Sequence, residues 1–290
     1  MEQMDLALEA REKIHKDVEI PGVTLKSYPS ESGRAKISNL RVISEEGKQR
    51  IGKEIGNYVT IELEQGGELD AEKYLYQELK ALCGGEKRRY LIVGLGNREI
   101  TSDAIGPYAI ESVYATSHFS EKTLKKNRWK AISVLSPGVM AQTGMEVQKI
   151  IKPLVEQMKI EQVIAIDSLA ARNVSRLGNT IQITDTGICP GGGIGNARKE
   201  LNKDTLGVEV IAIGVPTVVY AETIVRDYVE IGLKNKPGSG GQMAEWMEEI
   251  KNSSMEDLLV TGKDVNLQVR KMSKIIAAAC NHFSGIGSEG

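Results

Sequence analysis

From Leu69 onward, short runs of apolar, β-branched residues alternate with segments of helical character. The runs that indicate strands are YLIVGL, AISVL, QVIAI, TIQIT and VEVIAIGV. Strands that alternate with helices along a chain are typical of βαβ units, whose strands lie parallel. We therefore expect an α/β fold with a central, mostly parallel sheet flanked by helices. A chain of 290 residues is long enough to bury such a sheet.

The residues before this alternation have a different pattern. After an acidic lead, the segments VTLKSY, AKISNLRVIS and NYVTIELEQ alternate apolar with polar residues, which predicts β-strands. Near the other end, KPGSGGQ predicts a loop, and MAEWMEEIKN and VNLQVRKMSKIIAAACNHF have helical periodicity. We divide the chain into a β-rich amino-terminal accessory region, residues 1–67, and one compact α/β unit, residues 68–290, which ends in helices.

Charge and composition narrow the class of protein. With 37 basic and 39 acidic residues, the formal net charge is −2, so we expect no direct nucleic-acid partner. The three cysteines are odd in number and far apart, which favours reduced thiols over a disulfide framework. No apolar run has the length of a membrane span, and the start does not resemble a signal peptide. We expect a cytoplasmic protein without a membrane partner.

Two aspartates follow predicted strands. Asp103 comes after YLIVGL and the Gly96-Asn97 turn, and Asp167 follows QVIAI. Functional groups gather at the carboxyl ends of strands in open α/β sheets. Asp103 is also suited to cap the helix that follows. Asp167, in contrast, follows an apolar strand, where a carboxylate needs a hydrogen-bonding partner or has a functional role. Two facing carboxylates can share one proton and activate water, which predicts a hydrolytic site where either aspartate is the protonated one.

Other chemistries have little support in the sequence. Gly94 to Asn97 lacks the third glycine of a dinucleotide-binding loop, and the glycine-rich run 185–200 lacks the Lys-Ser/Thr ending of a phosphate loop. The three histidines, among them His118, have no paired spacing for zinc. Cys189 has no base near it in the sequence, so it is expected to be a bystander. We therefore expect no cofactor and no metal.

Several blocks together resemble the germination protease (spore protease) family. They are GLGN…TSDAIGP, SPGVMAQTGME, IAIDSLAAR, DTGICPGGGIGNARKELNKDTLG and VIAIGVPTVV, and the resemblance runs from about Asp5 to His282. It implies an α/β fold similar to that of hydrogenase-maturation proteases and an atypical aspartic endopeptidase that assembles as a homotetramer. The implied substrates are the small acid-soluble proteins that coat spore DNA, and the implied compartment is the forespore or spore core. The family's two catalytic aspartates fall on Asp103 and Asp167.

The sequence also offers candidates for roles outside the aspartate pair. Backbone amides at Gly96 and Asn97 are candidates to hold the developing oxyanion. Arg172 is a candidate to tune the acid pair or bind an acidic side chain of the substrate. Family members are made as zymogens that cut themselves, and DLALE is similar to their substrate sites in its order of acid, bulky apolar residue, alanine, any residue and acid. We therefore predict cleavage between Asp5 and Leu6, with residues 1–5 as a short propeptide.

Two alternatives remain open at this stage. A nickel-dependent hydrogenase-maturation endopeptidase has a similar glycine-asparagine loop and strand-end acids, but those acids hold nickel together with a histidine. None of the three histidines follows a predicted core strand. The other alternative is a protein that binds spore DNA-packaging proteins without cutting them. Cleavage in the presence of a chelator distinguishes the first, and mixing with spore proteins distinguishes the second.

Overall fold

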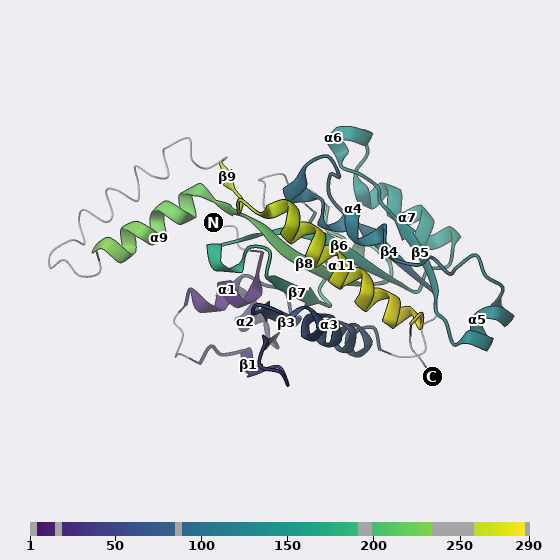
Figure 1. Ribbon diagram of the computed structural model, residues 1–290, viewed down its shortest axis with the longest axis horizontal. Coiled ribbons are helices and arrows are strands. Elements are labelled where there is room, and N and C mark those ends of the chain that lie inside the picture. Colours follow the sequence, from purple (N-terminus) through teal and green to yellow (C-terminus); the bar gives the residue numbers. More distant parts are fainter. Residues whose placement is uncertain (1–4, 15–18, 85–88, 191–198, 234–257, 288–290) are drawn as a thin grey trace.

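The computed structural model describes residues 5–14, 19–84, 89–190, 199–233 and 258–287. Within these ranges one sheet has the strand order β1-β2-β3-β7-β8-β6-β4-β5, and β9 pairs with β8 (Figure 1). The strands are β1 (Val23–Pro29), β2 (Ala35–Val42), β3 (Gly56–Leu63), β4 (Arg89–Gly94), β5 (Ala131–Leu135), β6 (Gln162–Ala171), β7 (Thr180–Thr184), β8 (Glu209–Tyr220) and β9 (Leu259–Val260). All eight strands expected from the sequence are present.

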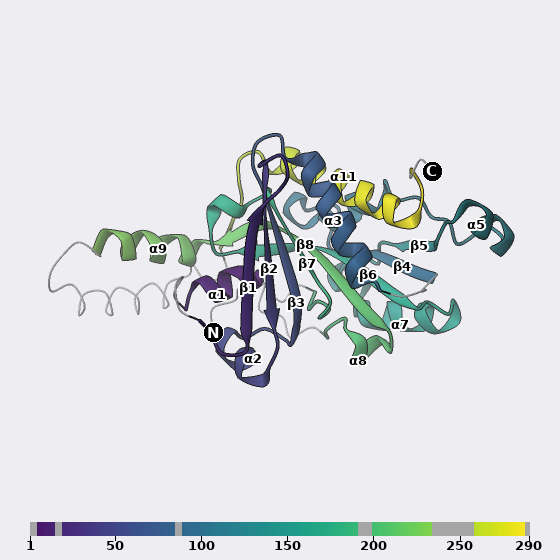
Figure 2. The ribbon, with the colours of Figure 1, turned by 90° about the horizontal axis from the view of Figure 1, so that it is seen from below.

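Helices pack on both faces of this sheet (Figure 2). The α-helices are α1 (Ala7–Glu12), α2 (Glu45–Ile51), α3 (Glu68–Leu82), α4 (Ile105–Ile110), α5 (Glu121–Asn127), α6 (Met140–Thr143), α7 (Val147–Gln157), α8 (Lys203–Leu206), α9 (Ala221–Leu233) and α11 (Val265–Ser284). Two short 3₁₀ turns are η1 (Thr101–Asp103) and η2 (Val174–Arg176). The predicted last helix is confirmed as α11, whereas KPGSGGQ and MAEWMEEIKN lie outside the described residues.

The central strands β8, β6, β4 and β5 are parallel to one another, which confirms the expected core. Alternate residues along each strand face opposite layers. Ile164 and Ile166 of β6 pack with α3, α4 and α11, while Val163 and Ala165 pack with α7 and α8. Because both faces are covered, these strands are apolar at nearly every position, as is usual for parallel strands.

The amino-terminal strands extend the same sheet. β1, β2 and β3 form an antiparallel meander, and β3 pairs with β7, which is itself antiparallel to β8. Ile37 and Ile61 belong to the same apolar cluster as Ile181 of β7. The predicted boundary after residue 67 falls between β3 and α3, and side chains of both regions share one core across it. β1 is the edge strand, and most of its residues are exposed.

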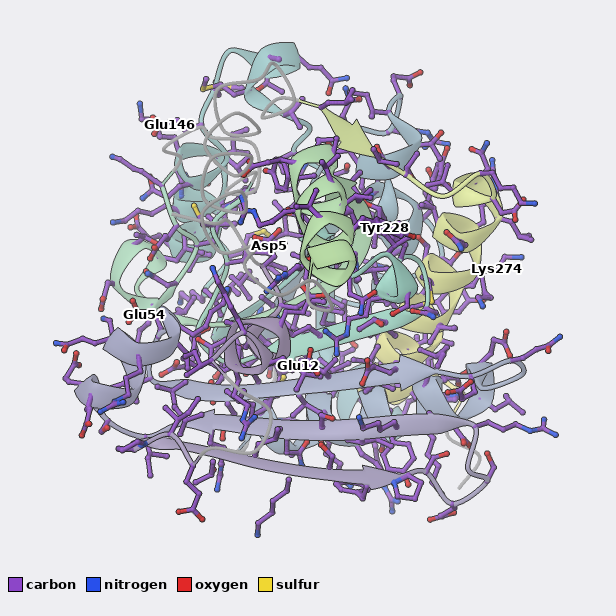
Figure 3. All side chains as sticks on the ribbon, turned by 90° about the vertical axis from the view of Figure 1, so that its left-hand side faces the viewer. Asp5, Glu12, Glu54, Glu146, Tyr228 and Lys274 are labelled. Atoms are coloured by element: carbon purple, nitrogen blue, oxygen red, sulfur yellow. The ribbon has the colours of Figure 1, made fainter. Side chains whose placement is uncertain are left out.

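Two helices, α1 and α9, lie outside the two layers that cover the central strands. α1 lies against β2 and β3 (Figure 3), and Ala7 and Ala10 belong to one apolar cluster with Leu40 and Tyr58. α9 follows β8 and projects away from the body of the molecule (Figure 1). In the described part of the chain, no helix combines the length and the apolar character needed to cross a membrane.

Candidate active site

The loop after β4 holds Asp103. The backbone N–H of Asn97 donates to Asp103 Oδ2 at 2.8 Å. Gly96 has φ +107°, and a β-carbon there would lie 2.0 Å from the main-chain oxygen of Asp103. Glycine is therefore required at position 96, both for the backbone conformation and for the close approach of the aspartate. The GLGN turn thus shapes the loop that positions this carboxylate.

Asp167 lies inside β6 and is 5% exposed. It faces Gly214 of β8 in the parallel register, and the Ser168 N–H donates to its Oδ1 at 2.9 Å. The sequence suggested that the strand ends just before Asp167, but β6 continues to Ala171 through an irregularity after Leu169. The strand is longer than expected because β8 continues to pair with it over this stretch. Asp167 is therefore held by a paired strand and not by a loop.

Close packing brings the two aspartates to one cavity. The Leu95 N–H donates to the Ile166 carbonyl at 2.8 Å, which joins the end of β4 to β6. A β-carbon on Gly106, at the start of α4, would lie 2.3 Å from the Leu95 oxygen and 2.5 Å from the Ile166 oxygen. Without a side chain there, α4 and η1 can rest directly on both strands. Asp103 and Asp167 consequently line the same cavity, whose volume is about 520 Å³.

The remaining predicted site residues take different positions. The N–H of Asn97 is directed at Asp103, so this amide holds the carboxylate in the structure. Arg172 donates from Nη2 to Asp227 Oδ1 at 2.8 Å, and its backbone N–H donates to Glu9 Oε2 at 2.7 Å. Arg172 does not line the cavity. The oxyanion role of Gly96 and Asn97 and the substrate role of Arg172 stay predictions.

Three further residues line the cavity, of which one was predicted as the residue before the self-cleaved bond and two were not singled out from the sequence. They are Asp5, Lys53 and Gln182, which come from the chain start, the α2–β3 connection and β7. Lys53 Nζ and Gln182 Nε2 both donate to the Asp5 carbonyl oxygen, at 3.0 and 3.3 Å. A polar residue in the middle of the apolar strand TIQIT was the one available signal for Gln182. For Lys53 the sequence offers none, because it precedes its strand in an ordinary polar turn.

Burial changes the acidity of the charged pair in this cavity. Burial raises the pKa of Asp5, and a hydrogen bond from the Ala170 N–H and the charge of Lys53 offset part of this. Burial lowers the pKa of Lys53, against the attraction of Asp5 and Glu9. Each charge therefore compensates for the desolvation of the other.

A second charged cluster anchors α1 beside the cavity. Glu9 is 2% exposed and accepts hydrogen bonds from the Arg172 and Asn173 amides and from Arg176 Nη1, at 2.7, 3.0 and 3.2 Å. Arg176 also pairs with Glu12 and Glu62, at 2.8 and 2.9 Å. Burial raises the pKa of Glu9, and these donors offset part of the rise. Both acids of the DLALE pattern therefore have partners in the fold.

Of the histidines and cysteines that the structure describes, only Cys189 lines the cavity. His118 is exposed and stacks on Phe119, and His282 pairs with Glu72 at 3.1 Å, so neither lines the cavity. His15 lies outside the described residues. Cys189 is partly buried and lines the cavity. Within the described ranges, no three His, Cys, Asp or Glu side chains are grouped so that they could hold a metal ion.

Comparison of the sequence with known proteins finds a family model and relatives that share one name. A family model described as "Germination protease" matches residues 1–245. The germination protease of Clostridium tetani is 38% identical, over 96% of this chain and 93% of its own length. That of Bacillus subtilis is 42% identical, over 80% of this chain and 67% of its own. A solved [NiFe] hydrogenase maturation protease, HycI from Thermococcus kodakarensis, aligns over 72% of this chain and 99% of its own, at 16% identity and a TM-score of 0.37.

Proposed function

The chain belongs to the germination protease family, and we propose that it is an aspartic-type endopeptidase that starts the degradation of small acid-soluble spore proteins during germination. Membership of the family makes it a peptidase. The aspartic mechanism is supported by one observation above all. Asp103 and Asp167, from the loop after β4 and from the adjacent strand β6, line the same cavity.

The two carboxyl groups suffice for peptide hydrolysis when they share one proton. The ionised aspartate takes a proton from water, and the water oxygen attacks the carbonyl carbon of the substrate. The protonated aspartate meanwhile donates its proton to the carbonyl oxygen, which gives a tetrahedral diol. The proton taken from water then passes to the leaving amine, and collapse of the diol returns the other proton to the pair.

The proposal includes self-processing between Asp5 and Leu6, with residues 1–5 as the propeptide. It is supported by the position of Asp5, which lines the same cavity as Asp103 and Asp167. The substrates in trans are the DNA-coating spore proteins, so the enzyme needs no direct contact with nucleic acid. We further propose that it works in the forespore or spore core as a homotetramer, which sedimentation of the purified chain tests.

One experiment separates this function from its alternatives. The purified chain is mixed with a small acid-soluble spore protein, with and without a chelator, and the fragments are identified by mass spectrometry. We expect cleavage that the chelator does not reduce and that is absent from the Asp103→Asn and Asp167→Asn variants. Loss of cleavage with the chelator would support the nickel-dependent alternative. A stable complex without fragments would support a binding protein.

A further inference from the structure

Hydrogen bonds from three parts of the fold hold the peptide around Asp5. Its carbonyl oxygen accepts from Lys53 Nζ and Gln182 Nε2, at 3.0 and 3.3 Å. Its carboxylate Oδ2 accepts from the Ala170 N–H at 2.7 Å. Gln182 Oε1 accepts from the Ala7 N–H at 2.7 Å. The side-chain amide of Gln182 therefore bridges the Asp5–Leu6 bond, because it binds the carbonyl oxygen of Asp5 and the N–H of Ala7.

The groups that hold Asp5 differ in what they recognise. Gln182 contacts only main-chain atoms, so it fits any residue in this place. Ala170 and Lys53 favour an acid, since one donates to the carboxylate and the other supplies a positive charge that Asp5 attracts. An uncharged side chain would leave the Lys53 ammonium with less compensation in a partly buried site.

The next residue along the chain enters an apolar site. Leu6 is fully buried and belongs to a cluster with Leu169, Ala171, Leu177 and Val219. The cluster lies beside Ala170, whose amide holds the Asp5 carboxylate. An acid followed by a bulky apolar residue therefore matches the two adjoining sites in both charge and size.

We propose that Lys53, Gln182 and the Ala170 amide form the site that binds the acidic residue preceding the scissile bond, in Asp5 of this chain and in protein substrates. This rests on the proposed function, since it assigns roles to residues of the same cavity. Lys53 and Gln182 hold the carbonyl oxygen of the bond to be cut, where negative charge develops during attack by water. Lys53 additionally selects an acid at that position, and Gln182 aligns the main chain across the bond.

Selectivity for an acid is the most direct test. Two peptides contain the sequence DLALE or NLALE, and kcat and KM are measured for the wild-type chain and for Lys53→Met. We expect the wild type to prefer the acid, and Lys53→Met to reduce the ratio of kcat/KM for acid over amide about tenfold or more, because it removes the attraction between the Lys53 charge and the acid. The kcat of Lys53→Met should also fall, since Lys53 contacts the reacting carbonyl.

Three variants serve as matched controls. Lys53→Arg keeps the positive charge and should retain part of the selectivity. Lys73→Met removes an exposed lysine of α3 that pairs with Glu31, both outside the cavity, and its selectivity should equal that of the wild type. Gln182→Leu should slow both peptides by a similar factor, because Gln182 contacts only the main chain. A Lys53→Met enzyme with the wild-type ratio of acid to amide would overturn the proposal while leaving the peptidase function intact.

A second readout needs no cleavage and so does not depend on the proposed function. In a chain carrying Asp103→Asn and Asp167→Asn, hydrogen exchange of the Ala7 amide reports how firmly the segment is held. Asp5→Asn and Lys53→Met should each speed this exchange about tenfold. Together they should speed it no more than Lys53→Met alone, because they remove the same interaction. Fully multiplicative effects would contradict the proposal.

Discussion

The two halves of the sheet make different contributions to one cavity. The parallel strands β4 and β6 position Asp103 and Asp167, the pair proposed to carry out hydrolysis. The antiparallel half brings Lys53, just before β3, and Gln182 on β7, which bind the segment at the chain start. Under the proposals above, the antiparallel half of the sheet recognises the substrate segment and the parallel half supplies the hydrolytic pair.

The largest expected effect lies in the parallel half. Asp103→Asn and Asp167→Asn should each lower cleavage of a spore protein on the order of 10⁴-fold, because each removes a titrating group that the other cannot replace. Fragment yield over time, measured by mass spectrometry, gives the rates. Thermal unfolding should confirm that both variants remain folded. Retained activity in either variant would remove that aspartate from the mechanism and would break the assignment of chemistry to the parallel strands.

The charged cluster that anchors α1 should matter for stability. Arg176→Met leaves Glu9, which is 2% exposed, without its cation, and should cost about 3 to 5 kcal/mol in the free energy of unfolding. Denaturant titration measures it. Arg50→Met serves as the control, because Arg50 pairs with Glu46 on the exposed surface of α2 and its loss should cost less than about 1 kcal/mol. An equal loss in the free energy of unfolding for the two variants would show that the buried charged cluster does not stabilise the fold.

The recognition side should also make self-processing depend on pH. Burial raises the pKa of Glu9 above its value in a free chain. Protonation of Glu9 therefore strengthens docking of α1, fully below the free value of about 4, and this contribution is lost as pH rises through the raised pKa. We expect the fragment that begins at Leu6 to appear several-fold faster as pH falls from 7 toward 4.

Mass spectrometry over this pH range measures that rate, and two chains serve as references. Glu9→Gln lacks the titrating group, so its rate should vary less with pH. The Asp103→Asn chain should give no fragment at any pH. A wild-type rate that is constant or that rises with pH would contradict the prediction, as would an intact Met1 terminus in an enzyme active on spore proteins.

The smallest effects are expected for a thiol inside the cavity and an imidazole outside it. Cys189→Ser and His118→Gln should each keep activity within about twofold, because the mechanism assigns neither of them a proton transfer or a bond to the substrate. The same cleavage assay measures both. A loss of several orders of magnitude in folded Cys189→Ser alone would move the chemistry from the aspartate pair to the thiol.

Most features of the parallel half of the sheet could be predicted from the local sequence. Each expected strand appears, because β-branched runs bounded by turns have few other stable solutions. Asp103 and Asp167 stood out since an acid at the end of an apolar run is unusual enough to require a reason. The length of β6 was misjudged, because it depends on how far β8 pairs with it and not on the composition of β6 itself.

By itself, the sequence determined the α/β class, the two candidate aspartates and the acid pattern of DLALE. Only the tertiary structure decided that the amino-terminal strands join the same sheet through β3 and β7, and that Lys53 and Gln182 meet at the Asp5 carbonyl. Periodicity reports which face of a strand is buried, whereas the order of strands in a sheet depends on contacts between residues far apart in the chain. Asp5 and Gln182 are separated by 177 positions and meet because β7 lies between β3 and β8, which no local pattern encodes.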